Sequence, residues 1–560
     1  MIARYLSCGV LAMLAVGNAH AQTVPGSSDP ARLGDRFRPP ETPQATPEIR
    51  VQGDNATAPP EQATDTHFTL SAVTIDGSTV YAAADFTPLY QSMLGHDVTI
   101  ADIYRLRDSI TAKYRAAGYI LSQAIVPPQK IEGGVVHIQI VEGSIGAVTI
   151  EGDGGNTQLV SAMVDRIKRS SPLNARDLER YTLLIDDLPG VSVSTILKPS
   201  VGTPGNADLV VTITRKMVEG FASSDNRGSQ AIGPFEFATG LSFNSVLGLN
   251  EQASVLLATT APTRELRYVS GKYAQVLNPE GLRLDLAGSY SRSQPGGSLH
   301  VLDARGFGTI LSVALSEPVI RSRSQTLRIG ASFTYQNSRT DLLGFLFSQD
   351  RVRYATARVS YDFSDLALGN AYPAANLVEL EINHGFDILG ASRTGSPTLS
   401  RANGHSDFTT LAGELSRVQR LGPQLSLAAS VSGQFAFDPL LSSQQFGLGG
   451  RRYGRGYEPS ELTGDKGLAV SIEPRFDLPR GALPFGVQLY AFYEVGKVWA
   501  KAPLAGQPGH ESLSSAGGGV RLSIASHVSA DFELAKPLTH DIASRGDRSW
   551  RPLFDVSVSF

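Results

Sequence analysis

The sequence has almost no cysteine and no hydrophobic run long enough for a membrane helix. Its single cysteine, Cys8, lies in an N-terminal apolar stretch, so disulfide bonds and thiolate metal sites are excluded from the rest of the chain. That stretch, Tyr5 to Val16, has about 12 residues, whereas a membrane-spanning helix needs about 20. Arg4, the apolar stretch and the segment AHA that follows predict a signal peptide over residues 1–21. Helical membrane spans are therefore excluded.

A strong charge imbalance and catalytic motifs are also absent from the sequence. The 49 basic and 53 acidic residues give a formal net charge of −4, which does not indicate nucleic-acid binding. The ten histidines are scattered, and the chain contains no GxSxG, HExxH or GxxxxGK[ST] motif. The glycines of GLGGRRYGRG have the wrong spacing for a nucleotide loop. We therefore expect no enzymatic activity, no cofactor, no metal site and no nucleic-acid partner.

Proline is concentrated in residues 22–66, which contain eight prolines among Asp, Thr, Gln and Ala. This composition predicts an extended, poorly ordered linker. Within it, DPARLGDRF would form at most one or two helical turns from Asp29, because so short a helix is marginal by itself.

One order of elements occurs twice after this linker. In residues 67–143 a strand pattern begins at Phe68, two helical stretches follow, and SQAIVPPQ and GGVVHIQIVEG are typical of two strands. The stronger helix starts after Thr99, stops at Gly118 and keeps its apolar side chains on one face. Residues 144–215 repeat the order with the strand GAVTIEG, two helices and two further strands. The sequence therefore predicts two small α+β modules in tandem.

From residue 216 to residue 560 the helical period disappears and short alternating segments are separated by turns. In the last segment Phe554, Val556, Val558 and Phe560 alternate with polar residues. Export, the lack of cysteine and the terminal aromatic residue favour a transmembrane antiparallel β-barrel with its apolar face towards lipid. An array of periplasmic or secreted β-sandwiches is the alternative. At about 20 residues per strand and connection, the region predicts about 16 strands, with 14 or 18 left open by counting.

The most informative segment of this region is FGLGGRRYGRGYEPSELTGDKG, residues 446–467. It is too rich in glycine and charge to be a spanning strand, so it is predicted to be a long loop. The centre of the loop holds Arg455, Gly456 and Tyr457. Downstream, the alternation in QLYAFYEVGKVW predicts a strand that turns a second set of residues towards the lumen, namely Phe492, Glu494 and Gly496.

These features resemble a known family. The two modules resemble POTRA (polypeptide-transport-associated) domains, above all in residues 113–143, and SSDNRGSQAIGPFEFATGLSFNSVLGLNEQ is similar to a first barrel hairpin. The loop triplet resembles that of the two-partner secretion transporters (TpsB, the haemolysin-activator type) in the outer membrane protein 85 superfamily. The resemblance covers the chain from about Phe68 to Phe560.

The resemblance implies a site and a function. In that family the loop folds back into the lumen and its arginine pairs with an acidic residue on the barrel wall, usually an aspartate where this chain has Glu494. The implied function is the capture of an unfolded, haemolysin- or adhesin-like exoprotein by the POTRA domains and its passage through the barrel. The implied transporter is a monomer in the outer membrane, in contact with lipid and lipopolysaccharide, with its N-terminal domains in the periplasm.

Two other functions stay open at this point. An insertase that assembles other outer-membrane proteins is one alternative, although such relatives usually carry three or five modules. A passive porin-type channel is the other, although it would not need the modules. In the family an N-terminal helix plugs the pore, but the short proline-rich segment before Phe68 argues against a plug in this chain.

Overall fold

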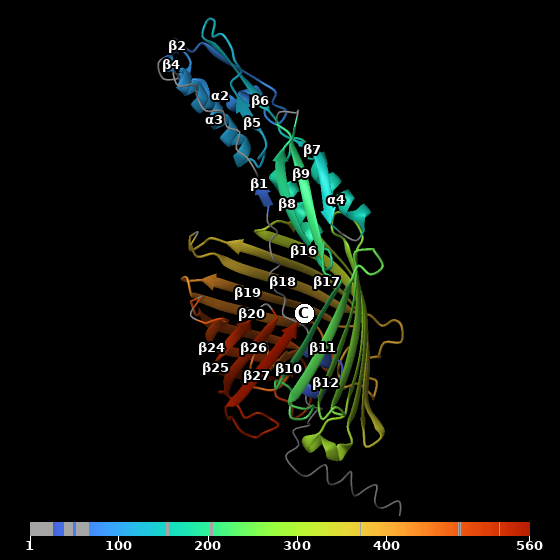
Figure 1. Cartoon of the computed structure of the whole chain (residues 1–560). Coiled ribbons are helices and arrows are strands. Elements are labelled where there is room, and N and C mark those ends of the chain that lie inside the picture. Colours follow the sequence, from blue (N-terminus) through green and yellow to red (C-terminus); the bar gives the residue numbers. More distant parts are fainter. Residues whose placement is uncertain are drawn as a thin grey trace, which may run out of the picture.

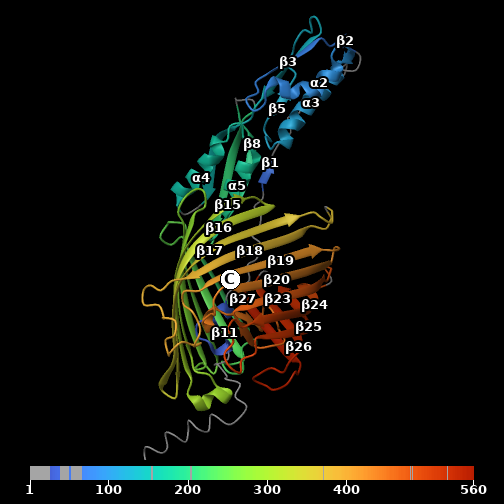
Figure 2. The same ribbon diagram turned by 180° about the vertical axis from the view of Figure 1, so that it is seen from behind.

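The computed structural model describes residues 26–37, 49–51, 66–152, 156–201, 205–369, 371–479, 481, 483–525 and 527–560. The predicted signal peptide lies outside these residues. Two small modules stand in line above a β-barrel, with the second module next to the barrel (Figures 1 and 2). None of the helices in the described ranges is both long enough and apolar enough to cross a lipid bilayer.

The first module is built on a long helix that packs on a three-stranded sheet. The helix begins after Thr99, whose hydroxyl accepts a hydrogen bond from the backbone N–H of Asp102 at 3.2 Å and caps the first turn. It ends before Gly118, which has a φ of +95°. Elements in chain order are β2 (His67–Thr69), β3 (Ala72–Asp76), η3 (Ala83–Phe86), α2 (Thr87–Tyr90), η4 (Gln91–Met93), β4 (Asp97–Thr99), α3 (Ile100–Ala116), β5 (Gln123–Ile125) and β6 (Val135–Val141).

The sheet of this module has the order β3-β6-β5, with β3 parallel and β5 antiparallel to β6. The single strand expected from Phe68 onward is divided, because β2 pairs with β4 whereas β3 pairs with β6. Between the two strands, fully buried Leu70 bonds through its backbone to the turn before β4. The break lets one short segment serve two sheets.

A carboxylate at the end of the first module binds the segment after β3 and the helix α3. Glu142 accepts hydrogen bonds from the backbone N–H groups of Thr79 at 2.8 Å and Val80 at 3.1 Å, and from the hydroxyl of Tyr114 at 2.8 Å. Burial opposes ionisation of Glu142, but these hydrogen bonds outweigh it and hold its pKa below the usual range. The charged form of Glu142 therefore stabilises the folded module.

The second module repeats this architecture. Its elements are β7 (Ile145–Gly152), α4 (Thr157–Arg169), α5 (Ala175–Asp186), β8 (Val191–Pro199) and β9 (Ala207–Arg215). The sheet order β7-β9-β8 corresponds to β3-β6-β5 of the first module, and a further short strand, β1 (Ile49–Val51), pairs in parallel with the outer edge of β8. Asn174 caps α5, because its side chain accepts a hydrogen bond from the backbone N–H of Arg176.

Ion pairs fasten the second module to the barrel. Arg321, at the end of a barrel strand, donates two hydrogen bonds of 2.7 and 2.8 Å to the carboxylate of Asp187. Arg180 donates to the carbonyl oxygens of Pro318 and Val319 in the same strand. The bidentate contact fixes orientation as well as distance, so this module has a defined position over one mouth of the barrel.

The barrel is a closed antiparallel sheet of sixteen strands, in which β27 pairs back with β10. Closure leaves no unpaired strand edge to face hydrocarbon. The strands are β10 (Val218–Asp225), β11 (Phe235–Asn244), β12 (Glu251–Ala261), β13 (Leu266–Val276), β14 (Arg283–Ser293), β15 (Arg305–Arg321), β16 (Gln325–Leu342), β17 (Phe345–Asp365), β18 (Ala374–Gly385), β19 (Thr409–Arg420), β20 (Leu425–Ala436), β23 (Lys466–Asp477), β24 (Gly486–Trp499), β25 (His510–Ile524), β26 (Val528–Pro537) and β27 (Arg551–Ser559).

Side chains alternate between the two faces of the barrel wall, as β24 illustrates. Tyr493 is 49% exposed on the outside, whereas its neighbour Glu494 is 1% exposed on the inside. Val558 and Phe560 of the C-terminal segment are likewise exposed outward. The structure thus has the predicted arrangement of two small α+β modules followed by a closed antiparallel barrel, and the barrel has sixteen strands.

Candidate functional site: a loop anchored inside the barrel

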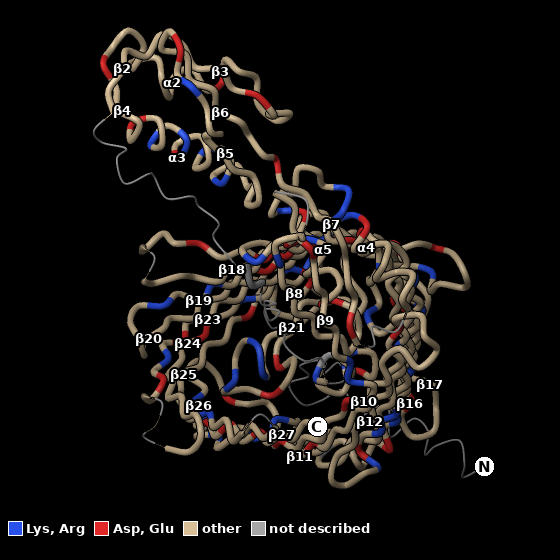
Figure 3. Tube along the Cα trace, turned by 45° about the horizontal axis from the view of Figure 1, so that its top comes forward, with Lys and Arg blue, Asp and Glu red and all other residues tan. Residues whose placement is uncertain are grey.

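The loop between β20 and β23 folds into the barrel. Two short strands, β21 (Phe446–Leu448) and β22 (Leu462–Gly464), pair at its base. Figure 3, which looks obliquely into the barrel, shows β21 within the ring of strands. Apolar residues of the loop, including Leu448, Tyr453 and Tyr457, form one buried cluster with Val498 and Leu513 of the wall. The loop therefore packs on one side of the lumen.

Glycines give the loop its shape at two positions, Gly454 and Gly456, of which the sequence had singled out only Gly456. Gly454 has a φ of +90°, a conformation that L side chains rarely adopt. Gly456 lies so close to β26 that a Cβ atom there would be 2.8 Å from the backbone nitrogen of Pro537 and 2.9 Å from the carbonyl carbon of Lys536. The arginine between these glycines is therefore pressed against the wall by the backbone.

Arg455 and Glu494, which the sequence had paired, are in direct contact. The Nε of Arg455 donates to Oε1 of Glu494 at 2.7 Å. The backbone N–H groups of Gly454 and Arg455 donate to Oε2 of the same carboxylate at 2.7 and 2.8 Å. Their side chains are 8% and 1% exposed, respectively. One acidic residue thus binds both the backbone and the side chain of the loop tip.

Two further carboxylates bind Arg455, and sequence reasoning missed both. The Nη1 of Arg455 lies 2.8 Å from Oε2 of Glu473 on β23 and 3.0 Å from Oε2 of Glu533 on β26. The signal that could have found them is strand alternation, since each is an acidic residue on the inner face of a predicted strand. The arginine is therefore held by three strands of the wall.

Cations and an aromatic ring balance this buried charge. The guanidinium of Arg455 lies 3.6 Å from the ring centroid of Phe492, a cation–π contact. Arg227 contacts Glu533 at 3.1 Å, and Arg521 contacts Glu473 at 2.8 Å. Because desolvation opposes the attraction in such networks, their main effect is to fix one geometry and not to add net stability.

The remaining predicted residues, Gly456, Tyr457 and Gly496, make room for the loop or tie it down. The hydroxyl of Tyr457 accepts hydrogen bonds from the backbone N–H groups of Thr539 at 3.2 Å and His540 at 3.3 Å. A Cβ atom at Gly496 would lie 2.6 Å from the side chain of Leu448. The structure therefore brings all six predicted residues together where the loop meets the wall.

The N-terminal segment Gly26–Phe37 also lies inside the barrel, where the sequence predicted only a linker and argued against a plug. It forms two 3-10 turns, η1 (Gly26–Ser28) and η2 (Leu33–Phe37). Leu33 is fully buried against Ile232 and Leu266. The expectation was wrong here, because contacts with the wall hold short turns that would be marginal alone.

Polar contacts fix this lumenal segment to both the wall and the loop. Arg36 forms a 2.9 Å ion pair with Glu236 of β11, and both side chains are almost completely buried. Arg32 donates to the hydroxyl of Ser460 in the loop at 3.2 Å. The segment and the loop therefore share the lumen and touch each other.

Two stretches of the chain match family models. Residues 205–522 match the model described as haemolysin secretion/activation protein ShlB/FhaC/HecB. Residues 68–143 match the model of the ShlB-type POTRA domain.

Known proteins match this chain over most of its length. The heme/hemopexin transporter protein HuxB of Haemophilus influenzae is 26% identical over 462 residues, covering 81% of this chain and 80% of HuxB. The solved structure of CdiB from Escherichia coli is 19% identical, covers 90% of this chain and 93% of CdiB, and has a TM-score of 0.71. BamA from Haemophilus ducreyi lacking POTRA domains 1–3 is 13% identical, covers 88% of this chain and 100% of that structure, and has a TM-score of 0.52. At these identities the two solved structures show the fold alone.

Proposed function

The chain belongs to the haemolysin secretion/activation protein family ShlB/FhaC/HecB, and from this premise we propose how its own residues act. It is an outer-membrane transporter of a two-partner secretion system, with its N-terminal domains in the periplasm. Its cargo is an unfolded exoprotein of haemolysin or adhesin type. The cargo is captured at the modules and passes through the barrel to the cell surface.

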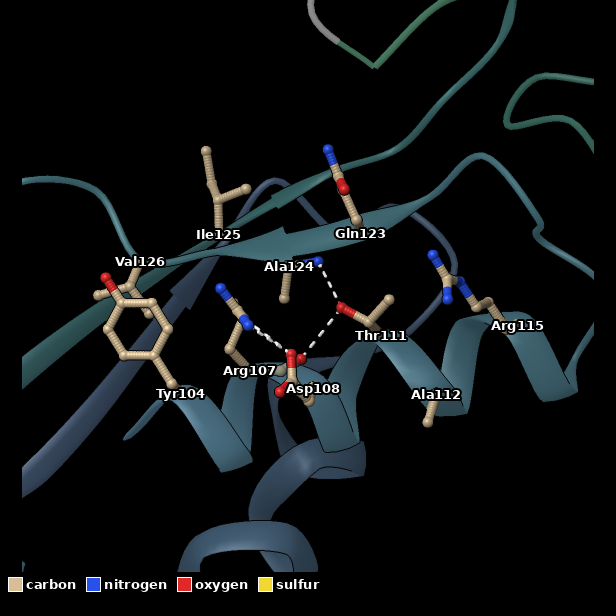
Figure 4. Close-up of a pocket in the computed structure, with 10 residues that line it drawn as sticks. All are labelled: Tyr104, Arg107, Asp108, Thr111, Ala112, Arg115, Gln123, Ala124, Ile125 and Val126. Carbon is tan, nitrogen blue, oxygen red and sulfur yellow. Dashed lines mark hydrogen bonds and ion pairs between the residues drawn. The ribbon is translucent and has the colours of Figure 1, made fainter. Parts of the chain in front are cut away.

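Capture begins at a groove of the first module (Figure 4). The groove runs between α3 and the edge strand β5, and its lining includes Tyr104, Thr111, Ile125 and Val126. Sheet edges bind extended chains by backbone hydrogen bonds, while adjacent pockets accept alternate side chains. An unfolded exoprotein offers both free backbone groups for the sheet edge and alternate side chains for the pockets. We therefore assign the first contact with cargo to this groove.

The anchored loop is the single observation that carries the proposed mechanism. Arg455 bound to three wall carboxylates holds the loop at one depth in the lumen. A planar guanidinium suits this position because it stays charged when shielded from water and grips several acceptors. The loop then forms one side of the path that the cargo follows. The drive is the folding of the cargo outside, since the periplasm offers no nucleotide.

The closure of the barrel bears on its oligomeric state and on its contact with lipid. All sixteen strands pair within one chain, so the transporter needs no second subunit to cover an edge, and we assign it as a monomer. The exposed apolar side chains of the outer wall, such as Tyr493 and Leu489, face lipid. Lipopolysaccharide is the partner in the outer leaflet.

Comparison of the secreted proteins of a deletion strain with those of wild type tests this function. We expect one large exoprotein to be missing from the medium and to return when the gene is restored. Broad loss of outer-membrane barrels would instead indicate an insertase, and altered solute uptake with normal secretion would indicate a passive channel. Either result would overturn the proposal.

A further inference from the structure

Two arginines oppose each other on the outer wall of the barrel. Arg267 of β13 lies directly opposite Arg292 of β14, and both side chains are exposed. Their chain neighbours Tyr268 and Ser291 point into the lumen, where they contact the segment Gly26–Phe37. Because successive side chains of a strand point to opposite faces, both arginines point outward.

This arginine pair lies at the border of the apolar band that faces lipid. The next outward residues along β13 and β14 are Val269 and Tyr290, which oppose each other and are 39% and 45% exposed. Figure 1 draws η5 (Gly297–Leu302), which connects β14 to β15, at the end of the barrel away from the two modules. Because the modules lie in the periplasm, the arginine pair lies at the level of the head groups of the outer leaflet.

Other arginines of the same outer wall have acidic partners, whereas the arginine pair has none within the described residues. Arg305 contacts Asp303 at 2.7 Å, and Arg339 contacts Asp341 at 2.7 Å. These two arginines are therefore neutralised by the protein itself. The arginine pair keeps two uncompensated positive charges on one patch of the wall.

The contacts that the arginine pair does make leave these charges in place. The Nε of Arg267 donates to the carbonyl oxygen of Thr263 at 3.3 Å. The guanidinium of Arg292 lies 5.8 Å from the ring centroid of Phe307, a cation–π contact. Like charges at directly opposite strand positions destabilise a sheet, so an anion bound between the two guanidiniums would stabilise this part of the wall.

We propose that Arg267 and Arg292 bind a phosphate group of lipopolysaccharide in the outer leaflet. The inference rests on the proposed function, because it takes the barrel to stand in the outer membrane. Guanidinium groups bind phosphate oxygens through paired N–H donors, and Cβ atoms at opposite positions are only about 5 Å apart. The acyl chains of the same lipid then lie along Val269 and Tyr290.

The same stretch of wall holds the lumenal segment on its inner face. The hydroxyl of Ser291 donates to the carbonyl oxygen of Pro30 at 2.8 Å, and Pro30 also lies against Gly306 and Gly308 of β15. A phosphate on the outer face removes the repulsion between the two arginines. It thereby stabilises the strands against which the segment Gly26–Phe37 packs.

Lipid binding to the detergent-solubilised mature protein tests the proposal. The probes are rough-type lipopolysaccharide and the same lipid after enzymatic removal of its phosphates. We expect wild type to bind the phosphorylated lipid about tenfold or more tightly, because charged hydrogen bonds to two guanidiniums are lost without phosphate. Equal affinity for the two lipids would overturn the proposal. Equally effective competition by inorganic phosphate or by phosphatidylglycerol would also overturn it, because the site would then not select lipopolysaccharide.

Matched variants locate the site on the wall. We expect R267Q/R292Q to lose affinity for lipopolysaccharide by about tenfold or more, whereas R267K/R292K, which keeps both charges, should stay within about threefold of wild type. The control R420Q removes an exposed arginine at the other end of the barrel and should bind as wild type does. Undiminished binding by R267Q/R292Q would overturn the inference. The titration does not depend on export, so this inference and the proposed function can fail separately.

Thermal unfolding in detergent gives a second readout. Without lipid, R267Q/R292Q should unfold at or above the temperature of wild type, because the repulsion between the two arginines is gone. Added lipopolysaccharide should raise the unfolding temperature of wild type more than that of R267Q/R292Q. A lower unfolding temperature for lipid-free R267Q/R292Q would contradict the proposal, since the arginines would then already be satisfied within the protein.

Discussion

Replacement of Arg455 by alanine should stop secretion while the barrel still inserts. The change removes the contacts of 2.7, 2.8 and 3.0 Å to Glu494, Glu473 and Glu533. Removal of one partner from a buried ion pair costs about 3–5 kcal/mol. At about 1.4 kcal/mol per tenfold change, the docked loop becomes about 140- to 3700-fold less populated. The sixteen-strand ladder keeps its own hydrogen bonds, so assembly of the barrel should not change.

The matched control lies three residues away in the same loop. The side chain of Arg452 is 71% exposed and contacts Glu414 at 3.4 Å, and exposed pairs of this kind contribute about 0–1 kcal/mol. Two measurements apply to both variants: the heat-dependent gel migration of the folded barrel, and the amount of exoprotein in the medium. We expect normal migration for both and loss of secretion only for R455A. Equal secretion by the two variants would refute the reasoning.

A conservative change at Glu494 distinguishes charge from reach. Glu494→Asp keeps the charge and withdraws the carboxylate by about 1.5 Å, while Arg455 retains Glu473 and Glu533. We expect secretion to continue in E494D and to fall strongly in E494A, which removes the acceptor of two loop N–H groups. Equal loss in both variants would show that the exact reach matters more than charge.

Three further changes probe other parts of the molecule. Gly456→Ala should block secretion as R455A does, because its Cβ would clash with the wall, whereas Gly509→Ala, with open space around it, should secrete normally. Arg36→Gln breaks the buried pair with Glu236 and should raise ion conductance through the barrel in planar bilayers. Glu142→Gln should remove stability that is present above the unfolded-state pKa of about 4.3 and lost as pH falls through the lower folded value, so hydrogen exchange in the first module should depend less on pH below 4.3.

Local periodicity explains why much of the fold was predictable. Apolar residues along α3 recur at helical spacing between a threonine cap and Gly118, so both ends could be read directly. On β24 the alternation of Tyr493 with Glu494 fixed which face met lipid. The duplicated order of elements further showed two modules. The first two signals are each contained within one element and its ends, and the third is the repetition of such local signals.

The full set of contacts at Arg455 could not be read in the same way. Glu473 and Glu533 lie on β23 and β26, and their meeting depends on the register of several consecutive strand pairs. A shift of one residue in any pair would turn one acidic residue to the lipid face. The sequence therefore showed that acids face inward without showing which of them meet one arginine.

The lumenal segment was missed for a related physical reason. Gly26–Phe37 forms only short 3-10 turns, so its sequence shows no amphipathic period. Its stability comes from contacts with Glu236 of the wall and Ser460 of the loop, which are far away in the sequence. A composition rich in proline indicates that a segment forms helices poorly, but it does not indicate that the segment lies outside the barrel lumen. Arg32 and Ser460 join the segment to the loop by a hydrogen bond of 3.2 Å. A movement of the anchored loop therefore either breaks this contact or carries the N-terminal segment with it.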